Sequence, residues 1–162
     1  MKAISLWQPW ATLWLLTDPD EKVYETRAWY THHRGPLLVH AAQKRDGEVR
    51  HALEDRHFSE RLSAHGLNIH DLPFGALIGR VILVNCCRME RLNPWPDWRE
   101  LQAGNWTPWR YAWQRSGTQV VRFPRPIPYK GAQGLFDVPD SVITGFSADY
   151  TGPLFAPREG GE

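Results

Sequence analysis

The chain has 162 residues, of which 42% are hydrophobic and 23% are charged, and its formal net charge is +1. This length suits one domain with its own core. The near-neutral charge excludes a global basic field, so any affinity for nucleic acid must come from local patches. No apolar run is long enough to span a bilayer, so we expect no membrane partner. The two cysteines, Cys86 and Cys87, are adjacent and fit a reducing, cytoplasmic setting.

The N-terminal part of the chain alternates strand-like and helix-like segments. Pro9 suits the first turn of a helix, and Trp10, Leu13 and Trp14 follow it at helical spacing, so these three side chains should face the core. The expected elements are a strand at 3–7, a helix from Pro9, a turn at 17–20, a strand at 22–29 and a strand at 36–41.

The rest of the chain contains one helical region and several short strands. Residues 48–65 have helix-forming composition, but their apolar side chains change face, so we expect a kinked helix or two helices that meet near 55–57. The other expected elements are a loop at 72–75, a long strand at 76–86, a loop at 93–105 with at most one helical turn, strands at 109–114 and 119–123 that pair around Ser116-Gly117, an extended segment at 122–130 and a strand at 135–138.

This pattern predicts the fold class and the domain limits. Many short strands with two or three helices indicate an α+β domain or a small barrel. We expect one domain over residues 1–143. Glycine, proline and charges dominate the remainder, which predicts a loosely packed tail over residues 144–162.

Charges of both signs occupy a segment that otherwise has the pattern of a strand. Residues two apart on a strand share a face, so Glu25 and Arg27 should lie together, with Lys22 at the strand entrance and aimed across the same mouth. A structural ion-pair cluster and a ligand cleft both fit this pattern. In a cleft, Lys22 would be a general base or nucleophile and Glu25 would carry a proton, whereas the planar fork of Arg27 would hold a phosphate or a carbonyl.

Nine tryptophans are the outlier in the composition. Their rings can stack on bases, although they more often fill a core. Trp29, beside the charged strand, is the best candidate for a stacking ring. Trp109, Tyr111 and Trp113 lie two apart and should share a strand face, either as core or as a stacking wall.

The remaining candidates are polar or lie near the expected cleft. His40 ends an apolar strand and is interpreted as a hydrogen-bonding or acid/base residue. The histidines are scattered and show no zinc spacing, and no nucleotide-cofactor motif is present, so we expect neither a metal nor a cofactor. The other expected ligand contacts are Trp10, Arg34, Tyr111 and Lys130.

Lys22, Glu25 and Arg27, together with their flanks, resemble the signature of a known family. The flanks are Ala3-Ile-Ser-Leu-Trp-Gln-Pro-Trp-Ala-Thr12 and His33-Arg-Gly-Pro-Leu-Leu-Val-His-Ala41. The family is the activating-signal-cointegrator homology (ASCH) family, whose signature is Gly-x-Lys-x-x-Glu-x-Arg. Here Asp20 stands in place of the signature glycine. The resemblance continues in residues 109–113 and 126–135, and so covers roughly residues 1–140.

The resemblance implies a PUA-like small β-barrel with flanking helices and an association with RNA. A bacterial branch of the family hydrolyses N4-acetylcytidine with the motif lysine, a threonine three residues later and a distant glutamate. Lys22 matches that lysine, Glu25 stands at the threonine position, and Glu90 and Glu100 are candidates for the distant glutamate. We therefore expect a domain that binds RNA or a modified nucleoside. The alternatives are an amidohydrolase of acylated cytidine that uses Lys22, a metal-assisted ribonuclease, and a DNA-binding or protein-interaction domain.

Overall fold

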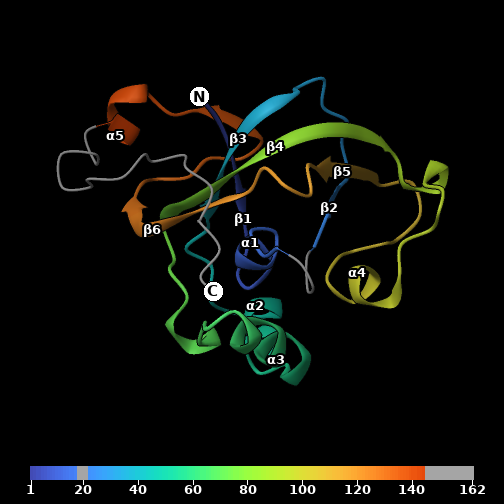
Figure 1. Ribbon diagram of the computed structural model, residues 1–162, viewed down its shortest axis with the longest axis horizontal. Helices are drawn as coiled ribbons and strands as arrows, with labels where there is room; N and C mark the ends of the chain where they lie inside the picture. Colours follow the sequence, from blue (N-terminus) through green and yellow to red (C-terminus); the bar gives the residue numbers. More distant parts are fainter. Residues whose placement is uncertain (18–21, 145–162) are drawn as a thin grey trace.

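The computed structural model describes residues 1–17 and 22–144 and has a mixed α+β architecture (Figure 1). The predicted α+β class is therefore confirmed. Its strands form one seven-stranded sheet. The strands are β1 (Lys2–Leu6), β2 (Tyr24–Arg27), β3 (Gly35–Ala41), β4 (Ala76–Arg88), β5 (Tyr111–Arg115), β6 (Val121–Pro128) and β7 (Leu135–Asp137). The helices are α1 (Trp10–Leu13), α2 (Glu48–Leu53), α3 (Arg56–Ala64), α4 (Trp98–Gln102) and α5 (Asp140–Thr144), with 3-10 turns at Ile69–Asp71 and Met89–Arg91.

The sheet has the strand order β2-β5-β4-β3-β1-β7, and β6 pairs with β4 beside this path. Strands β1 and β3 are parallel, whereas the other pairs are antiparallel. The two end strands, β2 and β7, do not pair with each other within the described residues. The sheet is thus open over this part of the chain, and the barrel that the family resemblance implies is not confirmed.

The central strand β4 has 13 residues and offers one edge to two shorter strands. Strand β6 pairs with the first half of β4, and β5 pairs with the second half; Figure 1 shows them one after the other along β4. The predicted pairing of 109–114 with 119–123 is therefore wrong. Ser116, in the expected hairpin turn, instead donates its backbone N–H to the carbonyl of Ile82 at 2.8 Å. A long central strand competes successfully for both partners because its buried backbone groups must all be paired.

Both faces of the sheet carry apolar side chains, as the alternation along the strands requires. One face packs on Trp14 and Leu15, and the other packs on α5 through Ile143. Leu13 and Leu16 point to a third cluster with the α2–α3 pair. The segment that begins with α1 is thus wedged between the sheet and the two helices (Figure 1). The prediction that Leu13 and Trp14 face the core is confirmed.

The helical region at 48–65 is divided into α2 and α3, as predicted. Asp55 separates them and caps α3 by accepting the backbone N–H of His57 at 2.8 Å. An aspartate at this position satisfies a donor that the first turn leaves unpaired. The break in the apolar stripe therefore coincides with a new helix start.

Several expectations fall outside the described residues. The expected turn at 17–20 and the expected tail at 144–162 lie almost wholly outside the described residues, so both stay predictions. Within residues 1–17 and 22–144, no helix combines the length and the apolar character needed to cross a membrane.

Candidate functional site

Two clefts adjoin across the end of β1. The first, called the Trp106 cleft, has a volume of about 660 Å³, and the second, called the Lys130 cleft, about 940 Å³. Both volumes are typical of ligand-binding pockets. Ser5, Trp7 and Arg27 line both clefts, so these residues form the junction between them. The Trp106 cleft is further lined by Trp10, Glu25, Thr26, Asn105, Trp106 and Arg110. The Lys130 cleft is further lined by Trp29, His40, Gln43, Tyr129, Lys130 and Gly131.

Arg27 is held at the junction by two neighbours. One guanidinium nitrogen, Nη2, donates to the carbonyl of Ser5 at 2.8 Å, and Nε lies 3.6 Å from Glu25 Oε1. Nε is buried and makes no hydrogen bond within the described residues. The contact with Glu25 follows from their i,i+2 spacing on β2, as expected from the sequence. A cation held in place where two clefts meet is suited to bind an anionic or carbonyl oxygen.

Lys22 is buried, and only 1% of its side chain is exposed. Its ammonium donates to the carbonyl of Tyr24 and to Glu25 Oε2, the latter at 3.0 Å. Lys22 is not among the residues that line either cleft, whereas Glu25, 14% exposed, lines the Trp106 cleft. The expectation that Lys22 reaches across the mouth is therefore wrong, because its ammonium is directed to the carbonyl of Tyr24 and to Glu25 instead. Its effect on a ligand would pass through Glu25.

Of the two glutamates that were candidates for the distant acid, Glu100 lies against the charged segment. Its carboxylate accepts the backbone N–H of Val23 at 2.8 Å and of Tyr24 at 3.1 Å. Helix α4 supplies Glu100, and Asp97 caps that helix. Glu90 instead accepts the backbone N–H of Trp109 at 2.7 Å. Glu100 thus positions the start of β2, and through it the residues that line the Trp106 cleft.

His40 lies in the wall of the Lys130 cleft and links three parts of the chain. Its Nε2 lies 2.8 Å from the carbonyl of Tyr129, and its Nδ1 lies 2.9 Å from Ser5 Oγ. Because a carbonyl only accepts, Nε2 carries the proton, and Nδ1 accepts the hydroxyl of Ser5. A Cβ at Gly131 would come within 2.5 Å of Ser5 Oγ and of His40 Cε1, so only glycine fits there. His40 therefore fixes the loop that carries Lys130.

Aromatic rings line both clefts. Trp29 packs edge-on against the buried Trp113, with ring centroids 4.6 Å apart, and remains exposed on the other side. Trp7 is also exposed, and the ammonium of Lys44 lies 4.1 Å from its ring centroid. Five of the nine tryptophans are exposed, although tryptophan is more often a core residue. The exposed rings at the clefts support the stacking interpretation of this composition.

The structure brings some of the predicted site residues to the clefts and leaves others away from them. The predicted residues that line the joined clefts are Glu25, Arg27, Trp29, His40, Trp10 and Lys130. Arg34 and Tyr111 line neither cleft; Arg34 donates to the carbonyls of Thr31 and His33. Trp109 precedes β5 and is exposed, whereas Trp113 is buried, so the expected shared face of Trp109 and Trp113 is wrong.

Sequence similarity connects this chain with one curated protein. No family model matches the chain. Over 125 residues, the chain is 30% identical to the human protein named Activating signal cointegrator 1. The match covers 75% of this chain and 20% of that protein, so the chain spans about a fifth of the length of its relative. The relative's name agrees with the name of the family that the charged segment and its flanks resemble.

The structure adds cleft residues that sequence reasoning missed. Ser5 and Arg110 are examples, and Arg110 donates to the carbonyl of Thr26 at 2.9 Å. Trp106, which gives its name to one cleft, donates its indole N–H to the carbonyl of Glu100 at 3.0 Å. No local pattern marks Ser5 or Arg110, since each is brought to the cleft beside residues far from it in the chain. Within the residues that the structure describes, no group of three or more His, Cys, Asp or Glu side chains is placed to hold a metal ion.

His40 is expected to make stability depend on pH. Burial lowers the pKa of His40 below the ordinary value of about 6.5. Between the two pKa values the unfolded chain binds more protons than the folded chain, so the free energy of unfolding falls as the pH drops below about 6.5. Above that pH His40 is neutral in both the folded and the unfolded chain, so it does not make the free energy of unfolding depend on pH.

Urea unfolding of the wild type and of a His40→Gln variant, over a pH series from about 7.5 to 5, would measure this effect. The variant keeps a hydrogen-bonding side chain but cannot titrate. We expect its free energy of unfolding to fall less steeply with decreasing pH than that of the wild type. Equal slopes for the two proteins would contradict the assignment to His40.

Proposed function

We propose that this chain is an ASCH-type, nucleic-acid-associated domain that binds RNA or a modified nucleoside in the joined clefts. The observation that carries this proposal is the position of Arg27, a fixed cation that lines both clefts. The exposed indole of Trp7 also lines both clefts, and that of Trp29 lines the Lys130 cleft. The similarity to Activating signal cointegrator 1 supports the family part of the proposal.

The chemistry of the clefts suits a nucleotide. Trp29 and Trp7 offer π faces on which any base can stack. The carboxylate of Glu25 and the side chain of Asn105 provide acceptor and donor groups for the edge of a base. Arg27 and Lys130 provide the positive charge for phosphates. Phosphate contacts of this kind release counterions, so affinity for an oligonucleotide should fall as salt rises.

Arg27→Ala is expected to weaken RNA binding strongly. A hydrogen bond to a charged group is worth about 1.5–3 kcal/mol, which corresponds to roughly a 10- to 150-fold loss of affinity. Fluorescence anisotropy with a labelled single-stranded RNA, titrated with each protein at fixed salt, measures the change. Arg56→Ala is the matched control, because Arg56 lies on α3 and its side chain is almost fully exposed.

The outcomes separate the hypotheses. Binding by the wild type and the control, with a large loss in Arg27→Ala, would support the proposed site. Equal binding by Arg27→Ala would remove the joined clefts as the site, and no binding by any of the proteins would remove the RNA-binding function. A DNA oligonucleotide of the same sequence tests the DNA alternative, and cytidine and N4-acetylcytidine, titrated by calorimetry, test the nucleoside alternative.

The amidohydrolase remains a second candidate because Lys22 and Glu25 form a buried pair whose carboxylate faces a cleft. In that role Glu25 would exchange the proton, and Lys22 would hold the Glu25 carboxylate in place through the contact at 3.0 Å. Incubation with N4-acetylcytidine, followed by chromatographic detection of cytidine, tests it. Cytidine formed by the wild type but not by Glu25→Gln would establish the activity, and its absence from the wild type would leave the binding function.

A further inference from the structure

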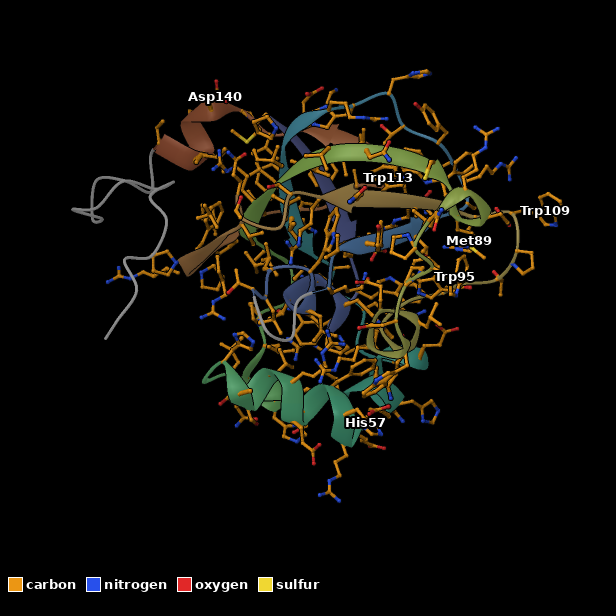
Figure 2. All side chains as sticks on the ribbon, turned by 45° about the vertical axis from the view of Figure 1, so that its right-hand side comes forward. His57, Met89, Trp95, Trp109, Trp113 and Asp140 are labelled. Carbon is orange, nitrogen blue, oxygen red and sulfur yellow. The ribbon has the colours of Figure 1, made fainter. Side chains whose placement is uncertain are left out.

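Trp109 is held in an exposed position that the fold maintains by specific contacts. Its side chain is 73% exposed, and its backbone has a φ of 72°. This left-handed conformation is rare for a bulky residue and costs free energy, and such conformations cluster at functional sites. Figure 2 shows Trp109 at the edge of the molecule, pointing away from it, while Trp113 lies within the sheet.

Two side chains at the end of β4 hold both backbone groups of Trp109. Arg88 Nη1 donates to the Trp109 carbonyl at 2.7 Å, and Glu90 Oε1 accepts the Trp109 N–H at 2.7 Å. Accepting this N–H lowers the pKa of the Glu90 carboxyl, so the carboxylate stays ionised at neutral pH. These two hydrogen bonds fix the backbone of Trp109, and with it the outward direction of the indole.

Trp109 belongs to a row of aromatic rings and guanidinium groups. Arg88 lies 6.0 Å from the Trp109 ring centroid and 4.5 Å from that of Tyr111. Tyr111 contacts Tyr30, with ring centroids 5.7 Å apart, and Arg34 lies 6.0 Å from the Tyr30 ring. We call these five residues the aromatic–arginine row. Tyr30 follows Trp29 in the chain, so the row begins beside the Lys130 cleft.

The composition of the row indicates which partner it fits. Aromatic rings with arginines among them match the stacking platforms and backbone contacts of proteins that bind single-stranded nucleic acid. Arg34 and Arg88 are positive, and His32 packs on Tyr30 with ring centroids 4.8 Å apart. The Glu90 carboxylate, the acid that contacts the row, is engaged with the Trp109 N–H. The charge of the row is thus complementary to a phosphate backbone.

We propose that the aromatic–arginine row is a second binding surface for single-stranded RNA, along which a strand continues after it leaves the Lys130 cleft. A base stacks on the indole of Trp109, and phosphates lie against Arg34 and Arg88. This inference rests on the proposed function, because it says where an RNA strand continues once its first nucleotides occupy the clefts. It also explains why Arg34 and Tyr111, which line neither cleft, are kept in defined positions.

RNA length provides the test. A labelled uridine trimer is short enough to report on the clefts, whereas a uridine strand of about twelve nucleotides would also reach the row. Trp109→Ala is expected to weaken binding of the long strand by roughly 5- to 150-fold, the range for one stacked base, and to leave binding of the trimer unchanged. Arg27→Ala is expected to weaken binding of both RNAs.

Trp98→Ala is the matched control. Trp98 is also exposed, at 62%, but it packs on His57, with ring centroids 6.5 Å apart. His57 lies at a part of the molecule well away from Trp109 in Figure 2. We expect this variant to bind both RNAs as the wild type does. Ultraviolet crosslinking of a 5-iodouridine-containing long strand, followed by tryptic mass spectrometry, gives a second readout, expected as an adduct on Trp109 within the peptide 100–110.

Each outcome bears on the inference. A long strand that binds Trp109→Ala as tightly as the wild type would overturn it, as would a crosslink confined to Trp98. If those results were accompanied by trimer binding that depends on Arg27, the cleft proposal would survive and the row would serve another partner, such as a protein. If the wild type bound neither RNA, both the proposed function and this inference would fall.

Discussion

Replacing Lys22 by methionine is expected to lower the free energy of unfolding by about 3 kcal/mol, the low end of the range for removing one partner of a buried ion pair. The Lys22 side chain is 1% exposed, and its ammonium is paired with Glu25 Oε2 at 3.0 Å. Methionine fills much of the same volume, so the loss reports mainly on charge and hydrogen bonding. Glu25 retains Arg27 at 3.6 Å, which keeps the expected loss from being larger.

A double-mutant cycle isolates the pair from other effects. In the variant Lys22→Met/Glu25→Gln, the Glu25 carboxylate that has lost its lysine partner is replaced by a neutral amide, so this variant should be more stable than Lys22→Met alone. Urea unfolding of the wild type, both single variants and the double variant gives the coupling free energy. A Lys22→Met protein as stable as the wild type would show that the pair contributes nothing, and the charged segment would then need another reason for its buried lysine.

The second large effect is expected from Arg115→Ala, with a loss of about 3–5 kcal/mol in the free energy of unfolding, because several hydrogen bonds from a charged group are removed at once. Arg115 is buried and donates to three carbonyls: Leu16 at 2.7 Å, Lys22 at 3.0 Å and Ser116 at 2.8 Å. It ties the segment that begins with α1, and the residues before β2, to strand β5.

Two further variants make this result interpretable. Arg115→Lys keeps the charge but lacks the planar guanidinium that reaches three carbonyls at once. The free energy of unfolding of this variant should therefore lie between those of the wild type and Arg115→Ala. Arg125→Ala, at an exposed position of β6, should change the free energy of unfolding by less than about 0.5 kcal/mol. Equal stability of Arg115→Ala and Arg125→Ala, measured by urea unfolding, would contradict the role assigned to Arg115. Because Arg115 holds the carbonyl of Lys22, its loss should also weaken RNA binding in the joined clefts.

The charged residues of the segment 22–27 lie at increasing distance from the core, from a buried lysine to an arginine at the clefts. Lys22 is buried, Glu25 lies between Lys22 and the Trp106 cleft, and Arg27 stands where both clefts meet. Lys22 and Glu100 therefore act as positioning residues for β2, one through the side chain of Glu25 and the other through two backbone N–H groups. A ligand in the clefts would meet Glu25 and Arg27 directly.

The local features of this protein were determined by the sequence itself. The division of residues 48–65 into two helices follows from the change of apolar face and from the capping side chain of Asp55. The contact between Glu25 and Arg27 follows from the period of two along a strand. Both features depend on residues within a few positions of one another, so the physical chemistry of short segments was enough to predict them.

Only the tertiary structure decided which segments meet and which side chains are covered. It paired β5 and β6 with β4 instead of with each other, buried Lys22, brought Ser5 and Trp106 to the clefts and left Trp109 exposed. These outcomes depend on contacts between residues far apart in the chain, such as the bond from Val23 to Glu100, which are 77 positions apart. Pairing and burial are set by competition among all such partners, and no single segment carries that information.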